Sequence, residues 1–462
     1  MRLLLGFAIA SLLGLPAPAE LAEVVLSGAA TDSRECGPGS LFFAFRGERA
    51  HGGDFVRDAF ARGAVAAVVE KGGGGAARLV GGLSTPLVIE VPSALAALQK
   101  LAGEWRDRMP ARVVGVTGSI GKTVARDVIA TVLAERFQVV RSERNYNNEI
   151  GLPLTLLKLG EEHDYAVLEM GMYALGEIRA LCALSRPSLG VVTNVGPTHL
   201  GRLGSIEHIA AAKAELLEAL PAEGLAVLNS DDERVRAMAE RAACPVLSFG
   251  LQAGNELRAT TVESRGLDGI ELEIAYQGAR HHLLLPMPGR GSAYAALAGA
   301  AVGLACGLSW DEILSGLGKT ANCSRLKVCQ VGGLRLLDDS YNAAPASVAV
   351  ALELLREMPA RRVAVLGDML ELGSYSETGH REVGRLVPPA ADLLVTVGQR
   401  ARWIAEEARA TGMALDAVRV CATSEEAGAV LGELAAGGDT ILIKGSRAMQ
   451  LESLVEALVQ RA

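Results

Sequence analysis

This 462-residue sequence is poor in aromatic residues and has no excess of positive charge. Phe, Trp and Tyr make up only 4% of the chain, whereas 53 glycines accompany an Ala-, Val- and Leu-rich remainder, which favours helices packed on parallel sheets over a β-sandwich. Lys and Arg number 45 against 53 Asp and Glu, giving a formal net charge of −8. No surplus of cations is available to neutralise nucleic acid or an anionic membrane. We therefore expect neither nucleic acid as a partner nor stable membrane insertion.

Paired cysteines are also lacking. The seven cysteines are an odd number, widely scattered, with no C-x-x-C pair: Cys36, Cys182, Cys244, Cys306, Cys323, Cys329 and Cys421. This pattern indicates reduced thiols rather than disulfides or a zinc site. The N-terminal stretch MRLLLGFAIASLLGLPAPA has the outline of a secretory signal, but it also fits a first amphipathic helix from Leu4 to Leu13 that ends at Gly14 and Pro16. We expect the helix, retained in a cytoplasmic protein, because the rest of the chain carries nucleotide-binding motifs.

The length predicts about three domains. A glycine run at Lys71 to Ala76 predicts a loop, and Arg106 to Ala111 resembles a linker. From Arg112 onward short apolar strands alternate with helical patterns, and near Leu326 a further series of apolar strands runs into polar loops. Such alternation predicts parallel sheets with crossover helices, which bind ligands at the carboxyl ends of their strands.

The most informative local motif is a phosphate loop. It comprises Thr117, Gly118, Ser119, Ile120, Gly121, Lys122 and Thr123, between an apolar strand and a helical pattern. Backbone N–H groups at a helix N-terminus bind phosphate oxygens, the lysine places a cation near the β and γ phosphates, and the threonine hydroxyl can bind Mg²⁺. The usual first glycine is replaced by Val116. The alternative is a simple glycine turn between a strand and a helix.

Three further residues are candidate site groups. Glu169 ends the apolar strand YAVLE, which favours a Mg²⁺ ligand over a surface glutamate. His199 follows the strand GVVTNV, but a lone histidine is more often structural. Lys213 lies among alanines in a helical pattern, where an ordinary solvent-exposed lysine is the simpler interpretation.

Taken together, the motifs resemble the Mur ligases. In order they are TGSIGKT, NYNNEIGLPLTLL, LEMGM, TNVGPTHLGRLGS, AAAKAE, DDSYNAAPAS, GDMLELG and KGSR, and the resemblance runs from about Thr31 to the C-terminus. It implies an α/β protein of three domains: an N-terminal UDP-sugar-binding domain over residues 1–108, a central ATP-binding parallel-sheet domain over 109–318, and a Rossmann-like C-terminal ligase domain over 319–462. DDSYNAAPAS favours the branch that joins D-alanyl-D-alanine to UDP-N-acetylmuramoyl-tripeptide in peptidoglycan precursor synthesis.

The resemblance also implies roles for individual residues. Lys122, Glu169, His199 and Lys213 would form the catalytic set, with Thr123, Glu169, His199 and a carboxylated Lys213 as ligands of Mg²⁺, of which two ions are expected. ATP would contact the phosphate loop, Ser292, Arg325 and Asp339. The substrates would contact Ser33, Arg34, Asn147, Asn148, Tyr341, Asn342, Lys444, Ser446 and Arg447. The chain is expected to act as a monomer.

The sequence departs from the family in two places. His51-Gly52-Gly53-Asp54-Phe55 replaces a segment that usually reads DGHDF. Gly291, Ser292 and Ala295 stand where the family usually has His, Asn and Asn near adenine, so we expect weakened adenine recognition.

The implied reaction transfers the ATP γ-phosphoryl group to a peptide carboxylate, and the resulting acyl phosphate is attacked by the dipeptide amine. Protein nucleophiles are not needed, and the pair His281-His282 is interpreted as structural. Three alternatives stay open. They are a neighbouring ligase, such as the one that adds the third residue of the stem peptide or folylpolyglutamate synthase, a phosphate-loop kinase, and a nucleotide-binding scaffold without activity.

Overall fold

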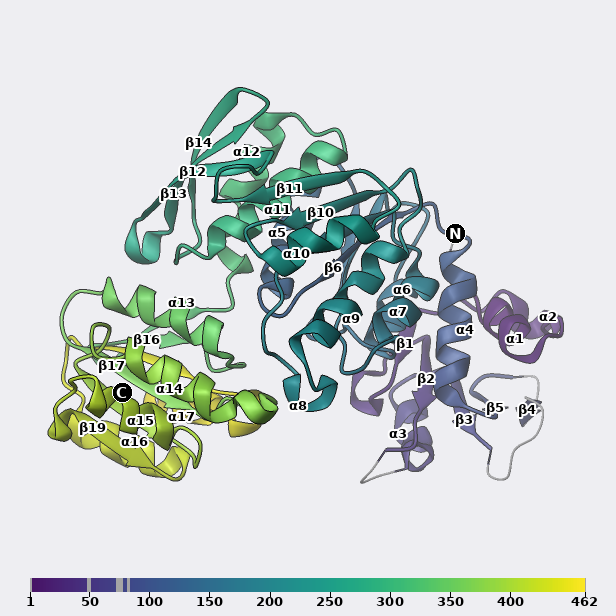
Figure 1. Cartoon of the computed structure of the whole chain (residues 1–462). Coiled ribbons are helices and arrows are strands. Elements are labelled where there is room, and N and C mark those ends of the chain that lie inside the picture. The colour runs from purple at the N-terminus through teal and green to yellow at the C-terminus, as the bar shows by residue number, and fades with distance from the viewer. Residues whose placement is uncertain (1, 48–50, 72–77, 81–83, 462) are drawn as a thin grey trace.

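The computed structural model describes residues 2–47, 51–71, 78–80 and 84–461. These residues form three α/β units, each built on its own sheet. Figure 1 shows the units as three lobes that follow one another along the chain, from purple and blue through teal to green and yellow. The expected three-domain α/β class is confirmed. The predicted loop at Lys71 to Ala76 lies, beyond Lys71 itself, outside the described residues.

The N-terminal unit has a five-stranded sheet in the order β1-β2-β3-β5-β4. Its strands are β1 (Gly28–Ala30), β2 (Ser40–Ala44), β3 (Ala66–Glu70), β4 (Arg78–Val80) and β5 (Leu87–Val91), and its helices are α1 (Leu5–Leu13), α2 (Ala19–Ala22), α3 (Val56–Ala61) and α4 (Ala94–Arg106). The expected first helix is present as α1 and ends at Gly14, whose φ of 70° is the left-handed value that glycine adopts readily. Leu5, Ile9 and Leu12 of α1 are buried in the core that also contains α4.

The central unit has a nine-stranded sheet in the order β14-β13-β12-β11-β10-β9-β6-β8-β7. The strands are β6 (Arg112–Thr117), β7 (Val139–Arg141), β8 (Tyr165–Glu169), β9 (Leu189–Val192), β10 (Leu225–Asn229), β11 (Val246–Gly250), β12 (Leu257–Ser264), β13 (Ile270–Tyr276) and β14 (Ala279–Leu285). Parallel pairing holds from β7 through β12, whereas β13 and β14 extend the sheet as an antiparallel hairpin that the sequence pattern did not predict.

Helices cover both faces of this central sheet. They are α5 (Lys122–Leu133), α6 (Gly151–Leu156), α7 (Glu177–Ser185), α8 (Leu200–Leu203), α9 (Ile206–Glu218), α10 (Glu233–Ala237), α11 (Ser292–Ala305) and α12 (Trp310–Gly318). Val128 of α5 and Ala296 of α11 pack with Val116 of β6 in one core, whereas Leu181 of α7 and Leu216 of α9 belong to the core on the other face. The arrangement leaves the carboxyl edge of the parallel strands open for loops.

The C-terminal unit has a six-stranded sheet in the order β15-β16-β20-β17-β18-β19. The strands are β15 (Lys327–Val331), β16 (Leu334–Asp338), β17 (Arg362–Gly367), β18 (Leu393–Val397), β19 (Val418–Cys421) and β20 (Thr440–Lys444). The helices are α13 (Pro345–Arg356), α14 (Ser376–Leu386), α15 (Arg402–Ala410), α16 (Ser424–Leu434) and α17 (Glu452–Arg461). Only β15 is antiparallel to its neighbour, so the polar loops after β16, β17 and β20 share one edge.

The three units are not joined equally. One continuous core runs from the N-terminal unit into the central unit, where the Trp105 indole donates to the carbonyl of Leu159 at 2.9 Å. The C-terminal unit has two cores of its own, one on each side of its sheet. The first two units therefore form one packed body, and the third meets it mainly through loops.

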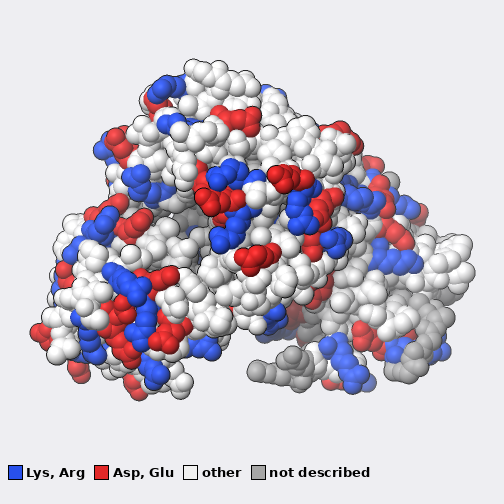
Figure 2. Space-filling model, in the orientation of Figure 1, with Lys and Arg blue, Asp and Glu red and all other residues white. Residues whose placement is uncertain are grey.

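All seven cysteines are free, as expected. None of the helices in the described part of the chain combines the length and the apolarity needed to cross a membrane. Figure 2 shows Lys and Arg interspersed with Asp and Glu over the face in view, which agrees with the balanced composition.

Candidate active site

The phosphate loop joins β6 to α5 as the sequence predicted. Gly118 and Gly121 both have positive φ values, 149° and 78°, and Gly121 immediately precedes the first turn of α5. A Cβ atom on Gly118 would lie 1.9 Å from Oγ1 of Thr193, so only glycine fits there. The loop thus directs the N-terminus of a 12-residue helix toward the open edge of the sheet, where backbone N–H groups bind phosphate oxygens.

The loop is held in shape by the residues that follow β9, a role the sequence analysis did not assign. Asn194 Oδ1 accepts from the N–H of Ile120 at 2.9 Å, and the Asn194 carbonyl accepts from the N–H of Ser119 at 3.0 Å. Thr193 Oγ1 donates to the carbonyl of Ile120 at 2.7 Å. The available signal was TNVG directly after an apolar strand. These contacts fix the loop before any ligand binds.

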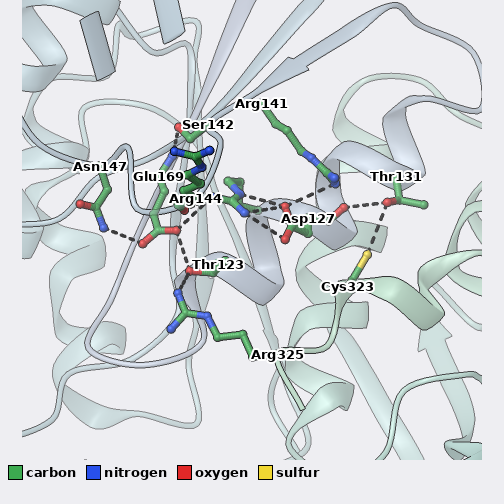
Figure 3. Close-up of polar contacts among 11 residues, drawn as sticks. Thr123, Asp127, Thr131, Arg141, Ser142, Arg144, Asn147, Glu169, Cys323 and Arg325 are labelled. Atoms are coloured by element: carbon green, nitrogen blue, oxygen red, sulfur yellow. Dashed lines mark hydrogen bonds and ion pairs between the residues drawn. The ribbon is translucent and has the colours of Figure 1, made fainter. Parts of the chain in front are cut away.

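Glu169 lies at the centre of a polar cluster beside the loop. Figure 3 shows its carboxylate between Asn147 and Thr123, which donate at 2.8 and 2.7 Å. The buried guanidinium of Arg126 lies 3.4 Å away and also pairs with Asp127 at 2.8 Å. Burial works to raise the pKa of Glu169, but Lys122 and the hydrogen bonds from Thr123 and Asn147 outweigh it and leave that pKa lowered. Glu169 is therefore held as a carboxylate. Arg126, which contacts it, was not among the site residues predicted from the sequence.

The two lysines of the predicted catalytic set both lie where burial disfavours the charged form of the amine. Nζ of Lys122 donates to the carbonyls of Gly118 and Ser119 at 2.8 and 3.2 Å, and burial lowers its pKa. Lys213 is buried in α9 with only 2% of its surface exposed, contrary to the simple expectation of a solvent-exposed helix lysine. Within the described part of the chain, no group forms a hydrogen bond or ion pair with the Lys213 amine. Burial, then the nearby Lys122 charge, lowers its pKa well below the usual value.

His199 lies in the loop between β9 and α8 with a φ of 61°. Its Nδ1 atom lies 2.6 Å from Oε2 of Glu371, a residue of the C-terminal unit. Tyr173 contacts the imidazole edge-on, with ring centroids 5.0 Å apart. His199 therefore stands where the central and C-terminal units meet.

Residues of the C-terminal unit face the same site. Arg325 donates to Thr123 Oγ1 and stacks over the Tyr341 ring at 4.6 Å. Arg447 contacts the same ring at 5.3 Å. The buried Lys444 ammonium pairs with Asp339 at 2.5 Å and donates to the carbonyl of Asn342 at 2.9 Å, so its charge is already partly neutralised.

One cavity of about 1770 Å³ connects these groups. Its lining includes most of the predicted residues from both units: Ser119, Ile120, Gly121, Lys122, Thr123, Asn147, Asn148, Glu169, His199, Ser292, Arg325, Asp339, Tyr341, Asn342, Lys444, Ser446 and Arg447. Thr117, Gly118 and Lys213 are not among its lining residues. Asn148 lies just before α6, and its Oδ1 accepts from the N–H of Gly151 at 2.9 Å.

Two predicted substrate residues lie outside this cavity. Ser33 is buried, and the exposed Arg34 side chain pairs with Asp32 at 2.6 Å. A separate cavity of about 310 Å³ lies nearby, between the N-terminal and central units, and is lined by Arg144, Tyr146 and Lys158 among others. The sequence did not predict this second cavity, because it forms only when the two units pack together.

The cavity also extends past Gly291, Ser292 and Ala295. Ser292 Oγ donates to the carbonyl of Pro288 at 2.9 Å. Beside it, the Tyr294 hydroxyl donates to Asp231 at 3.0 Å, and burial together with the Asp231 charge raises the Tyr294 pKa. Asp231 had not been singled out in the sequence, because it is one of two adjacent acids after an apolar strand.

The arrangement matches known proteins along the whole chain. Residues 26–106 match the Mur ligase family catalytic domain, 116–303 the Mur ligase middle domain, and 324–447 the Mur ligase glutamate ligase domain. The UDP-N-acetylmuramoyl-tripeptide–D-alanyl-D-alanine ligase of Bacillus subtilis is 34% identical over 443 residues, which cover 95% of this chain and 94% of that protein. The chain belongs to the Mur ligase family.

Solved structures agree with this membership. A crystal structure of MurF from Acinetobacter baumannii, 26% identical, superposes with a TM-score of 0.85 and covers 100% of this chain and 99% of its own. MurF ligase from Thermotoga maritima in complex with ADP, 27% identical, has a TM-score of 0.78 and covers 94% of this chain and 98% of its own. The family and the fold expected from the sequence are thereby confirmed.

The donor groups of this Mur ligase suit a magnesium ion that arrives with a nucleotide. Among the described residues, no group of three or more His, Cys, Asp or Glu side chains is placed to hold a metal ion. Mg²⁺, however, is commonly held by one or two carboxylates together with substrate phosphates and water. The Glu169 carboxylate and the Thr123 hydroxyl beside the phosphate loop fit that requirement.

Proposed function

We propose that this chain is an ATP-dependent ligase that joins D-alanyl-D-alanine to UDP-N-acetylmuramoyl-tripeptide in peptidoglycan precursor synthesis. The observation that carries the proposal is the shared cavity, in which the phosphate loop and Glu169 face Arg325, Asp339 and Tyr341 of the C-terminal unit. A cavity of this size can hold a nucleotide and a peptide together. Relatives that span more than nine-tenths of the chain carry this activity in their names.

The phosphate loop, with the side chains of Lys122 and Thr123, would hold the phosphates. Lys122 can leave the carbonyls of Gly118 and Ser119 for phosphate oxygens, which relieves a cation whose pKa burial has lowered. Thr123 and Glu169, with His199, would hold Mg²⁺, which spreads the negative charge of the transferring phosphoryl group. Arg325, which already reaches Thr123, lies where it can add a further positive charge.

Lys213 would serve as a carbamate. Its buried amine has a lowered pKa, and no group among the described residues pairs with it, which favours the neutral form that reacts with CO₂. The nitrogen of the neutral amine bonds to the CO₂ carbon and releases one proton, which leaves an anionic carbamate in place of the amine. The carbamate oxygens are the hard ligands that Mg²⁺ prefers.

The two-step reaction is needed because a peptide carboxylate is a poor electrophile. A peptide carboxylate does not lose oxide, so in-line transfer of the ATP γ-phosphoryl group first converts it to an acyl phosphate. The dipeptide amine then attacks the acyl carbon, the amide bond forms and phosphate leaves. The protein's contribution is to position the reactants and neutralise their charge.

Substrate contacts are divided between the units. Ser33 and Arg34 would contact the UDP moiety, and Asn147 and Asn148 the peptide near the reacting carboxylate. Tyr341, Asn342, Lys444, Ser446 and Arg447 would bind the peptide and dipeptide from the C-terminal unit. ATP and the UDP-linked precursor place the proposed reaction in the cytoplasm, and a cavity completed by one chain's own units is compatible with a monomer.

The decisive experiment measures ADP release with ATP, UDP-N-acetylmuramoyl-tripeptide and D-alanyl-D-alanine, alone and in combination, with product mass recorded in parallel. We expect ADP and a product heavier by one dipeptide residue only when all three are present. ADP release without dipeptide would indicate a kinase, and tight nucleotide binding without any turnover would indicate a scaffold. Ligation of glutamate instead of the dipeptide would identify a neighbouring ligase.

A further inference from the structure

The contact between His199 and Glu371 joins two units that have separate cores. His199 follows β9 in the central unit, and Glu371 follows β17 in the C-terminal unit. Besides the 2.6 Å separation of Nδ1 and Oε2, the N–H of Gly201 donates to the Glu371 carbonyl at 3.3 Å. The His199 ring, as the largest influence, lowers the pKa of Glu371. Backbone and side chain of Glu371 therefore both engage the His199 loop.

The loop that carries Glu371 is held in an unusual conformation. Glu371 has a φ of 66°, a left-handed value that a residue with a side chain rarely adopts. The preceding residues are anchored: Met369 N–H donates to Nε2 of the buried His380 at 2.9 Å, and Leu370 N–H donates to Ser446 Oγ at 2.8 Å. The strained residue is thus fixed by its surroundings and presented outward to the central unit.

Two glycines allow the loops to approach closely. A Cβ on Gly373 would lie 2.6 Å from Cα of Gly201, and a Cβ on Gly201 would lie 3.2 Å from Cα of Gly373. The backbones of α8 and of the 3₁₀ turn Gly373–Tyr375 therefore meet with no side chain between them. The carboxylate reaches His199 only because of this close approach.

The His199 ring also contacts the Tyr173 ring edge-on, and Tyr173 in turn lies under the Arg202 guanidinium at 4.5 Å. The imidazole is only 23% exposed. With Nδ1 lying 2.6 Å from Glu371 Oε2, Nε2 is the nitrogen left for the cavity that His199 lines.

We infer that Glu371 is a positioning residue that acts through His199. Its carboxylate accepts a hydrogen bond from the Nδ1–H group and so keeps the proton on Nδ1 and the lone pair on Nε2, the arrangement in which a histidine serves as a metal ligand. The metal ion in this inference rests on the proposed function, whereas the contact between His199 and Glu371 is present in the structure without any ligand. Because Glu371 belongs to the C-terminal unit, His199 is oriented only while that unit is docked. Docking thereby completes the site.

The test compares Glu371→Ala and Glu371→Gln with Glu377→Ala as a matched control. Glu377 is a glutamate six residues away that pairs with Arg381 outside the cavity. Gly201→Val is a second route, because it blocks the close approach while Glu371 is retained. The full-length protein is labelled with ¹⁵N-histidine, and the His199 signal among seven histidines is assigned by its loss in His199→Gln. Spectra are recorded at pH 8.5, where ordinary imidazoles are neutral.

We expect His199 to carry its proton on Nδ1 in the unaltered protein and in Glu377→Ala. In Glu371→Ala and Gly201→Val the proton should move largely to Nε2, and Glu371→Gln, whose amide oxygen still accepts, should lie between. Mn²⁺ affinity in the presence of ADP, measured by electron paramagnetic resonance, should fall about tenfold in Glu371→Ala, the usual effect of removing such a supporting carboxylate. The Mg²⁺ concentration for half-maximal activity should rise by the same factor, with little change in kcat at saturating Mg²⁺.

An unchanged tautomer and an unchanged Mn²⁺ affinity in Glu371→Ala would overturn the inference. A fall in kcat that excess Mg²⁺ does not restore would also overturn it, since Glu371 would then act by another route. Failure of the unaltered protein to ligate would refute the proposed function instead, because the tautomer measurement does not depend on activity.

Discussion

Replacing Lys122 by alanine removes the cation nearest the bound phosphates and tests the centre of the proposed mechanism. Among the described residues Nζ donates only to the carbonyls of Gly118 and Ser119, at 2.8 and 3.2 Å, so it can move to a phosphate. Two unit charges about 4 Å apart interact by about 4 kcal/mol at an effective dielectric constant of about 20. If that interaction strengthens fully in the transition state, its loss lowers kcat/KM by about 1,000-fold.

Folding should be nearly unaffected by the same change. The alanine variant loses two hydrogen bonds worth about 1 kcal/mol each, but it also removes a cation whose pKa burial has lowered, and the two effects oppose each other. We expect a Tm close to that of the unaltered protein. Lys319→Ala is the matched control, because Lys319 is an exposed lysine of the same unit that pairs with Glu135 at 2.7 Å.

The assay is steady-state ADP release with all three substrates, accompanied by thermal unfolding of each variant. A Lys122→Ala protein that folds and retains activity within tenfold of the unaltered protein would remove the phosphate-loop assignment. Loss of activity in Lys319→Ala as well would show that the assay reports general damage rather than the loop.

Three further predictions concern other parts of the molecule. Lys213→Ala should abolish ADP release, and acetate or formate should restore part of it by supplying the lost oxygens; rescue by amines alone would contradict carboxylation. Ala295→Asn should lower the KM for ATP two- to tenfold, since a restored hydrogen bond is worth about 0.5–1.5 kcal/mol. If the unaltered protein already prefers ATP over GTP by more than about 100-fold, other groups must recognise the adenine base. His380 is buried with a lowered pKa, so its contribution to stability is complete above pH 6.5 and is lost as the pH falls through its folded pKa. Urea unfolding at pH 8 and at pH 5 should therefore show a smaller drop in the free energy of unfolding for His380→Gln than for the unaltered protein. Equal drops in the two proteins would disprove this prediction.

Local sequence signals were sufficient for the strand-to-helix turns of the site. The phosphate loop, Glu169 at the end of β8 and the loop after β9 were all placed correctly, because an apolar strand followed by glycines or polar residues predicts the carboxyl edge of a parallel sheet. Lys213 shows the limit of that reasoning. Its alanine-rich helix suggested an exposed lysine, and only the packing of α9 on the sheet shows that the amine is buried.

The groups that support the site were much harder to predict. Arg126 is an ordinary helix arginine in the sequence, yet it is buried and lies 3.4 Å from Glu169. The antiparallel hairpin of β13 and β14 was missed as well, because its alternating pattern extends a sheet that had been interpreted as wholly parallel. The partner of Arg126 lies 43 residues away in sequence, whereas the two strands of the hairpin are neighbours in the chain.

By itself the sequence determined the α/β class, the order of the units and the chemistry of the loop after each strand, since periodicity, glycine placement and residue type act over a few neighbouring residues. Tertiary structure alone decided which loops meet. Asn194 reaches the phosphate loop 74 residues away, Arg325 reaches Thr123 across 202 residues, and Glu371 meets His199 from a separately packed unit. Such contacts depend on how sheets and units pack, and packing is set by the summed burial of whole faces rather than by any local pattern.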